Sequence, residues 1–369
     1  MNFISKGLLF IFFSMSLVAI ANGDSHITLQ GQWVTEPDGR AMLDPQTSGL
    51  KAWRGKFISL SDASADKSQQ KQIHIIDGSN GVLSEISLPI KLSKRVKQSC
   101  FSRYLADTPD LEGLAVDKKD DKVFYVVTED ARIGGDLSES CQKRFKNTGS
   151  TPYPTLLLRL ALQPDNTVLI THVRPIQFHP SFKVGNFSND GIEGLATGKD
   201  DTLYLALEKD SHEKARIFTI TITKEFWQSS DFIPVEDPGF FTPSFTKGNH
   251  PINGLDYLAV ENHPGYLIAA ARNDDQLWII DIAKTKATKV VSLEFLAPTG
   301  IDDGSCNAWD DLNNTSLEGV AVEGNLIWLI NDPWKKHYKA NILCESNAEK
   351  FKSFSPLIFS LPIDPNWMN

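Results

Sequence analysis

Five short phrases place a polar residue directly before a glycine, and together they could supply oxygen ligands to a metal ion. The phrases are Ser48-Gly49, Glu112-Gly113, Glu193-Gly194, Asn253-Gly254 and Glu318-Gly319, each followed by leucine or valine. Three carboxylates that lie close together repel one another unless a cation or protons neutralise them. Carboxylate and amide oxygens suit Ca²⁺, which takes ~6–8 oxygen ligands. We therefore predict a calcium site formed by Glu112, Glu193, Asn253 and Glu318.

A structural role for the same residues remains open. Each glutamate could instead accept hydrogen bonds from backbone amides, or pair with a basic neighbour, and so fix the geometry of its unit. Zinc is not favoured, because the five polar positions include no nitrogen or sulfur ligand.

A second polar position follows each phrase. A second apolar run ends in an acidic or amide residue, namely Asp62, Glu129, Glu208, Asn273 and Asp332. We expect these residues to form the rim of a ligand site. Lys209, Arg272 and Trp334 lie next to them in the chain and could contact an anionic or aromatic group of a ligand.

The catalytic residues are not identified by any motif, because the chain has no nucleophile elbow, zinc-protease, P-loop or dinucleotide-binding signature. The candidates for a general acid or base are His250, His337 and Glu208, with His212 as a further histidine near the repeated positions. Histidine titrates near neutral pH, although a lone histidine in a loop is more often a surface residue.

The spacing of the phrases predicts the fold. The five glycines are 64, 81, 60 and 65 residues apart, and a unit that recurs at such a period indicates a repeat architecture. The second unit, for example, reads as four short strands at Leu111–Val116, Val123–Thr128, Leu156–Leu162 and Val168–Val173. Four short antiparallel strands per unit are typical of a β-propeller blade. The sequence thus predicts an all-β protein with a single propeller.

Five blades are favoured. The fifth unit lacks an outer strand, and the segment Ile27–Val34 could supply it, which would close the ring. Six blades remain possible if the long insertion Phe232–Pro251 hides a degenerate blade. The first strand of each blade lines the central channel, so the polar phrases would converge at the channel mouth. The long insertions lie next to the same strand ends, and we expect one loop face to hold the site.

The N-terminus predicts export. Lys6, an apolar run up to Ile20 and the small residue Ala21 are typical of a secretory signal peptide. We expect a leader at residues 1–21, a propeller domain at 22–369, and a periplasmic or secreted monomer. Loss of Lys6 changes the net charge from −9 to −10, and there is no cluster of basic residues. Nucleic acid and stable membrane insertion are therefore not expected; a small molecule or a protein at the loop face is.

Four cysteines in an exported chain predict disulfides. Cys100 and Cys306 each lie 13 residues before the glycine of a phrase, whereas Cys141 and Cys344 follow the same glycines by 28 and 25 residues. These equivalent positions predict the pairs Cys100–Cys141 and Cys306–Cys344.

The order of the phrases resembles the SdiA-regulated family of exported bacterial propellers. The resemblance rests on Ile58-Ser59-Leu60-Ser61-Asp62, Asp110-Leu111-Glu112-Gly113-Leu114-Ala115, Gly191-Ile192-Glu193-Gly194-Leu195-Ala196, Asn253-Gly254-Leu255-Asp256 and Leu317-Glu318-Gly319-Val320-Ala321. The related phytase-like, or esterase-like, propellers share the Glu-Gly-Leu-Ala phrases. The ring is also similar to that of the calcium-dependent lactonase propellers, which implies that Ca²⁺ polarises a substrate carbonyl here. The fourth phrase departs from the pattern, because it continues with Asp256-Tyr257.

Two functions follow as hypotheses. The first is a metal-assisted hydrolase that acts on an ester, a lactone or a phosphoester. The second is a non-catalytic propeller that binds a small ligand or a protein through its loop face.

Overall fold

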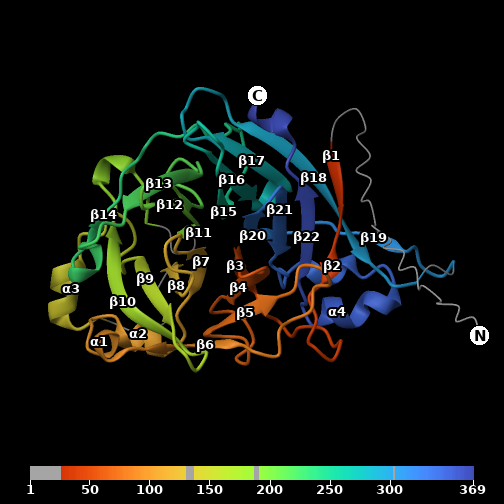
Figure 1. The fold of residues 1–369 in the computed structure, drawn as a ribbon, viewed down its shortest axis with the longest axis horizontal. Coiled ribbons are helices and arrows are strands. Elements are labelled where there is room, and N and C mark those ends of the chain that lie inside the picture. The colour runs from red at the N-terminus through yellow and green to blue at the C-terminus, as the bar shows by residue number, and fades with distance from the viewer. Residues whose placement is uncertain (1–25, 130–136, 187–190, 302–303) are drawn as a thin grey trace, which may run out of the picture.

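The computed structural model describes residues 26–129, 137–186, 191–301 and 304–369, and they form a five-bladed β-propeller (Figure 1). The leader expected at 1–21 lies outside the described residues.

The first blade contains β3 (Thr47–Trp53), β4 (Lys56–Ser61), β5 (Gln72–Ile76) and β6 (Leu88–Leu92). The second contains β7 (Leu111–Val116), β8 (Val123–Thr128), β9 (Leu156–Leu162) and β10 (Val168–Gln177). Strands β6 and β10 pair in parallel and join these two blades at their outer edges.

The remaining blades repeat the antiparallel order. The third contains β11 (Ile192–Thr197), β12 (Thr202–Leu207) and β13 (Arg216–Thr221). The fourth contains β15 (Ile252–Leu258), β16 (Tyr266–Ala271), β17 (Gln276–Asp281) and β18 (Lys289–Pro298), with β19 (Trp309–Asp311) added to β18. The fifth contains β20 (Leu317–Glu323), β21 (Leu326–Asn331) and β22 (Leu357–Pro362).

The helices are short and lie in the connections. They are α1 (Lys94–Lys97), α2 (Ser102–Ala106), α3 (Glu139–Phe145) and α4 (Ala348–Lys352), with 3₁₀ turns at Pro180–Phe182, Phe226–Gln228, Arg272–Asp274, Tyr338–Asn341, Glu345–Asn347 and Pro365–Met368. None of the helices in the described ranges has the length and apolar character that a membrane crossing requires.

The strands form where branched and aromatic residues alternate between turn formers. The turn between β7 and β8 is an example. The Asp117 carboxylate accepts hydrogen bonds from the backbone N–H groups of Lys119 and Asp120, at 2.8 and 2.9 Å, so the side chain itself closes the turn. The side chains of the strands then pack between blades: Leu114 belongs to the core between the first two blades, and Ala115 to the core between the second and third.

A close contact at the repeated glycines joins the five innermost strands into a ring. A methyl group built on Gly194 would lie 3.0 Å from the backbone nitrogen of Leu255, the residue after the glycine of the next blade. The same relation holds around the ring, with distances of 3.0 Å (Gly49 to Leu114), 2.9 Å (Gly113 to Leu195), 3.1 Å (Gly254 to Val320) and 2.7 Å (Gly319 to Leu50). The last contact returns to the first blade, which closes the circle.

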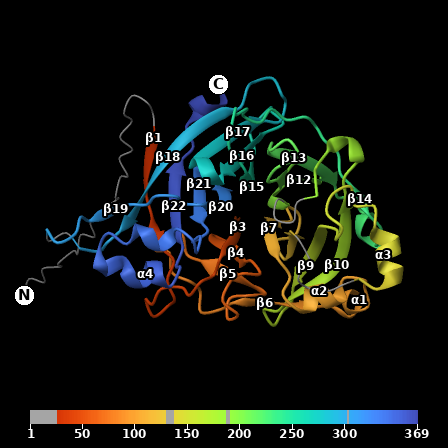
Figure 2. The ribbon, with the colours of Figure 1, turned by 180° about the vertical axis from the view of Figure 1, so that it is seen from behind.

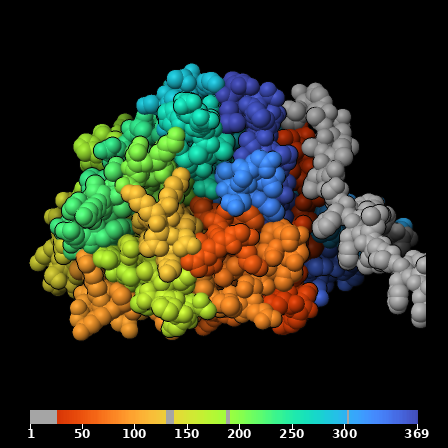
Figure 3. All heavy atoms as spheres, viewed as in Figure 1, coloured from red at the N-terminus to blue at the C-terminus, as the bar shows by residue number. Residues whose placement is uncertain are grey.

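The N-terminal segment closes the propeller, but it does so in two pieces. Strand β1 (His26–Gln30) pairs in parallel with β18 of the fourth blade, and only β2 (Gln32–Trp33) pairs with β22 of the fifth. The chain changes partner at Gly31, whose missing side chain admits the Phe359 ring. The rear view shows β1 beside β18 (Figure 2), and Figure 1 shows β2 near β22. In the space-filling view the red start of the described chain lies beside its blue end (Figure 3).

The six-blade alternative does not occur. Within Phe232–Pro251 the structure has only the two-residue β14 (Ile233–Pro234), which pairs with β10, and an isolated bridge between Glu236 and Thr219. This segment therefore lies between the outer strands of the second and third blades and makes short backbone contacts with both.

Both expected disulfides are present. Cys100 pairs with Cys141 and Cys306 pairs with Cys344, with Cα atoms 5.8 and 5.6 Å apart. Each bridge ties the loop before an innermost strand to the loop after the neighbouring strand of the same blade. Two such bridges are typical of a protein that matures outside the reducing cytoplasm.

The glycine contacts predict that a single methyl group added at one of these glycines strongly destabilises the fold. Gly319→Ala would bring its Cβ to 2.7 Å from both the backbone nitrogen and the Cβ of Leu50, and we expect the free energy of unfolding to fall by ~1–3 kcal/mol or more. The control is Gly324→Asn, at a turn with φ of 60° and nothing within 4 Å of its Cβ position, which asparagine tolerates. Urea unfolding measures both; equal stability of the two variants would contradict the packing argument.

Candidate functional site

Each innermost strand is irregular at its polar phrase. The antiparallel register shifts between Ser48 and Leu50, between Leu111 and Leu114, between Ile192 and Gly194, between Ile252 and Gly254, and between Leu317 and Gly319. A β-bulge of this kind re-aims a side chain at the rim of a closed sheet. The five bulges thus place the residues of the first ring (Ser48, Glu112, Glu193, Asn253 and Glu318) at one end of the channel.

The first ring brings three carboxylates together. Oxygen atoms of Glu112, Glu193 and Glu318 all lie within 4.8 Å of one another. The Ser48 hydroxyl donates to Glu112 Oε2 at 2.8 Å, and the Asn253 amide nitrogen donates to Glu318 Oε1 at 3.2 Å. All five side chains are buried, with 1–7 % of their surface exposed.

Backbone hydrogen bonds identify the residues of the second ring. In four blades the N–H of Asp62, Glu129, Glu208 or Asp332 donates to the carbonyl of the residue two positions before the first-ring residue. In the fourth blade the residue with this bond is Arg272, which donates to Pro251 O. The second ring is therefore Asp62, Glu129, Glu208, Arg272 and Asp332.

The expectation that Asn273 belongs to this ring is wrong by one residue. Strand β16 ends at Ala271, opposite Ile252, and the chain then turns as a 3₁₀ helix. Asn273 is consequently exposed, and its amide donates to the backbone carbonyl of Asn249 in the neighbouring loop.

The two rings form one continuous acidic cluster. Carboxylate oxygens of Glu129, Glu193 and Glu208 lie within 4.8 Å of one another, and so do those of Asp110, Glu112 and Glu129. Asp110 was not among the sequence-predicted site residues. In the sequence, its position two residues before Glu112 is the feature that could have identified it. In the structure, its side chain also accepts a hydrogen bond from the Ala63 N–H at 2.9 Å.

Arg272 lies inside this cluster. Its guanidinium donates to Ser316 Oγ at 2.7 Å and to Asp332 Oδ2 at 2.7 Å, and it is 3.2 Å from Glu318 Oε2. The sequence suggested that Arg272 contacts a ligand, but in the described structure all three of these contacts are to the fifth blade.

Burial and mutual repulsion raise the pKa values of the cluster. Burial, together with Asp110, Asp62 and other carboxylates, raises the pKa of Glu112 well above its usual range. Burial, together with Glu112 and other glutamates, likewise raises the pKa of Glu193. Burial also raises the pKa of Glu318, although Arg272 opposes the rise. Burial beside Asp332 and Asp110 raises the pKa of Asp62 to about 8.

The donors fit a hard cation. All of them are oxygen atoms of carboxylates, an amide and a hydroxyl, the set that Ca²⁺ prefers. The Asn253 amide supports this assignment, because its nitrogen is used by Glu318 while its buried oxygen Oδ1 accepts no hydrogen bond from the described part of the chain. Buried polar atoms normally have a partner, and an ion would provide one. The buried acidic groups can thus bind a metal ion.

Lys51 crosses the channel on the inner side of the cluster. It lies three residues after Ser48 on β3, yet its ammonium donates to the carbonyls of Leu255 in the fourth blade and Val320 in the fifth, at 2.5 and 3.0 Å. It also pairs with Asp256 at 3.4 Å. This buried lysine ties the first, fourth and fifth blades together.

The candidate histidines contact residues outside the two rings. His250 Nδ1 bonds Asp274 at 2.7 Å and its Nε2 bonds the Lys247 carbonyl at 2.8 Å, so both ring nitrogens are used. His337 is exposed and its ring meets the edge of Trp334, which is itself 39 % exposed; His212 is also exposed. Among the catalytic candidates, the cluster contains Glu208.

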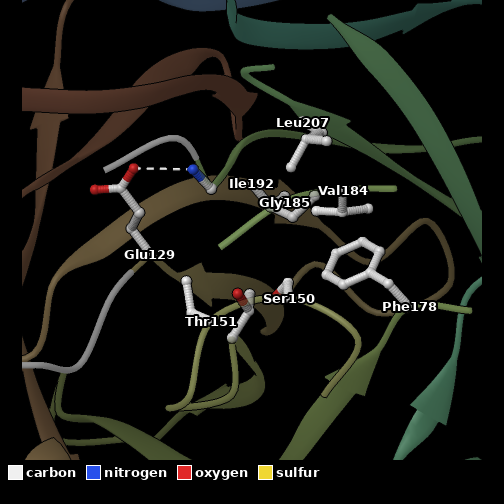
Figure 4. A pocket seen from close by; sticks show the side chains of 10 residues that line it. Glu129, Ser150, Thr151, Phe178, Val184, Gly185, Ile192 and Leu207 are labelled. Atoms are coloured by element: carbon white, nitrogen blue, oxygen red, sulfur yellow. Dashed lines mark hydrogen bonds between the residues drawn. The ribbon is translucent and has the colours of Figure 1, made fainter. Parts of the chain in front are cut away.

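A small pocket opens beside the second ring, between the second and third blades (Figure 4). Glu129 lies at one side of it, where Oε1 accepts the Gly191 N–H at 3.1 Å, and the Phe178 ring lies at the other. Ser150 and Thr151 border the pocket, while Val184, Ile192 and Leu207 make its wall apolar. The pocket has a volume of about 20 Å³, which is enough for about one water molecule next to the acidic cluster.

No protein-family model and no curated protein matches the chain. Among solved structures, it is similar to the PQQ-bound aldose sugar dehydrogenase of Streptomyces coelicolor, with 11 % identity, coverage of 89 % of this chain and 96 % of that chain, and a TM-score of 0.38. It is also similar to the major Malassezia sympodialis allergen Mala s 1 (10 % identity, 87 % and 94 % coverage, TM-score 0.46). A third is the periplasmic gluconolactonase of Pseudomonas aeruginosa (11 % identity, 70 % and 56 % coverage, TM-score 0.32). Similarities this remote carry no argument about activity.

The raised pKa values predict an unusual dependence of stability on pH. Asp62 has a pKa of about 8 in the folded protein and an ordinary value of 3.8, so between these values the folded state binds the extra proton. Stability must therefore fall as the pH rises through this window. In chelator, we expect the melting temperature to decrease steadily from pH 5 to pH 8. Asp62→Asn should flatten the decrease; a metal-free protein that becomes more stable over this range would refute the electrostatic account.

Proposed function

We propose that this protein is a calcium-dependent, extracytoplasmic hydrolase whose site is the acidic end of the propeller channel. One observation carries the proposal: carboxylate oxygens of Glu112, Glu193 and Glu318 lie within 4.8 Å of one another, and the amide of Asn253 that bonds Glu318 has an oxygen with no hydrogen-bond partner among the described residues. Such a group costs free energy unless a cation or protons compensate it. A second polar ring then supplies further carboxylates on the solvent side of the proposed ion.

Each group has a distinct part in this proposal. Glu112, Glu193 and Asn253 Oδ1 would hold the ion. Glu318, which forms an ion pair with Arg272 and accepts a hydrogen bond from the Asn253 amide nitrogen, would complete the set. When bound, Ca²⁺ supplies a Lewis acid for a carbonyl or phosphoryl oxygen. Glu208, which has a carboxylate oxygen within 4.8 Å of one of Glu193, would accept a proton from a water molecule that attacks the substrate.

The substrate class follows from this chemistry. An ester, a lactone or a phosphoester carries an oxygen that a hard cation polarises. Membership of the SdiA-regulated family, a cleaved leader at residues 1–21 and a periplasmic or secreted location belong to the same proposal. They are supported by the phrases of the sequence and by the two disulfides.

Calcium should stabilise the fold through Glu193. A ligand that binds only the folded state adds ~2.7 kcal/mol when it is ~100-fold above its dissociation constant. We expect chelator to lower the melting temperature of the wild type and calcium to restore it, whereas Glu193→Gln should lose most of this response. Glu323→Gln, an exposed position at the other end of β20, is the matched control and should respond like the wild type. A wild-type melting curve indifferent to calcium and chelator would defeat the proposal.

Hydrolysis should require both calcium and Glu208. With panels of carboxylic esters, lactones and phosphate esters, we expect turnover that chelator abolishes. Removal of a general base typically costs ~10²–10⁴-fold in rate, so Glu208→Gln should lose turnover by about that factor while it still binds calcium in calorimetry. If wild-type protein binds calcium but hydrolyses no member of the panels, the site belongs to a binding propeller, and the hydrolase half of the proposal is wrong.

A further inference from the structure

The second ring has one member of opposite charge. Four of its positions hold Asp62, Glu129, Glu208 and Asp332, and the equivalent position of the fourth blade holds Arg272, as the shared backbone hydrogen bond shows. The chain thus has an arginine at the one position where the repeat would otherwise add a further polar or acidic group to the cluster.

Three side-chain contacts of Arg272 cross a blade boundary. Its guanidinium reaches Ser316, Glu318 and Asp332, which belong to the fifth blade, and it is largely buried, with 22 % of the side chain exposed. Charge-assisted hydrogen bonds from a planar guanidinium are strong and directional. Arg272 therefore holds the fourth and fifth blades together at the point where the carboxylates of the fifth blade are most crowded.

Arg272 also orients the first ring through Glu318. One oxygen of Glu318 faces Arg272, and the other accepts the Asn253 amide nitrogen at 3.2 Å. Because this hydrogen bond fixes the orientation of the planar amide group, the amide oxygen of Asn253 is directed away from the Glu318 oxygen that accepts it. The Asn253 Oδ1 is the buried atom that accepts no hydrogen bond within the described structure. The order Arg272–Glu318–Asn253 thus leaves one neutral oxygen ready for a cation.

We propose that Arg272 is the positioning residue and built-in counter-ion of this site: it keeps the carboxylates of the fifth blade assembled when no divalent cation is bound, and it limits the stability that the cation adds. The inference rests on the proposed cation site. Without Arg272, Glu318 and Asp332 would lose their common partner, and a bound cation would have to replace it. The metal-free protein would then be weaker, and its dependence on calcium stronger.

The test compares melting temperatures in chelator and in calcium for the full chain. For Arg272→Gln, we expect a lower melting temperature in chelator and a calcium-induced rise that exceeds the wild-type rise by at least about 2 °C. Arg272→Lys keeps the charge and should show a rise close to that of the wild type. The matched control is Arg174→Gln, which removes hydrogen bonds to the carbonyls of Phe226, Asp231 and Phe232 outside the channel. It should lower both temperatures equally.

A double variant keeps the inference testable if Arg272→Gln does not fold. Arg272→Gln with Asp332→Asn removes one positive and one negative charge, and we expect its melting temperature in chelator to exceed that of the single variant. A double variant no more stable than the single one, or an Arg272→Gln calcium response equal to that of Arg174→Gln, would overturn the counter-ion role. If the wild type itself ignores calcium, the proposed function fails, but the comparison of single and double variants in chelator still decides the role of Arg272.

Discussion

The innermost strands of neighbouring blades approach so closely at five points that a methyl group on each glycine there would press against the next blade. At each point a glycine faces the backbone nitrogen of the residue that follows the equivalent glycine in the next blade, at 2.7 to 3.1 Å from the position of a Cβ atom. Five such contacts define the radius of the ring. Much of the remaining structure follows from that radius, because the residue before each glycine must then lie near the channel axis.

The small radius of the ring also brings like charges close together at the site. The bulge at each glycine aims a polar side chain at one channel end, and the chain places glutamate at three of the five positions. The adjacent strands add four more charged residues of the same sign and one arginine. The narrow ring prevents the carboxylates from separating, and Lys51 crosses the channel on the other side. Protons, Arg272 and a divalent cation are the available means of compensation, and the all-oxygen donor set favours a hard cation.

The repeated phrases made the fold and the first ring predictable from the sequence. A polar residue before a glycine, five times at similar spacing, required only the strand order of a propeller to converge on one point. The equivalent offsets of Cys100 and Cys306 likewise predicted both disulfides. The N-terminal strand was expected as one piece, and the structure divides it at Gly31 because the chain there passes against Phe359.

The fourth-blade member of the second ring, the place of Asp110 in the acidic cluster and the contacts of Lys51 could not be predicted, because they depend on contacts between segments far apart in the sequence. Arg272 and Asn273 are adjacent, and only the end of β16 at Ala271 shows which of them belongs to the second ring. Asp110 joins the cluster through Glu129, and Lys51 finds its partners more than 200 residues away. Sequence spacing gives no measure of such distances.

The most direct test of this account is a crystal structure of the protein soaked with terbium, a hard cation that replaces calcium and scatters anomalously. The account predicts a strong anomalous peak bounded by Glu112, Glu193 and Asn253 Oδ1, at the acidic end of the channel. A map with no peak there, or with peaks confined to surface carboxylates, would contradict it.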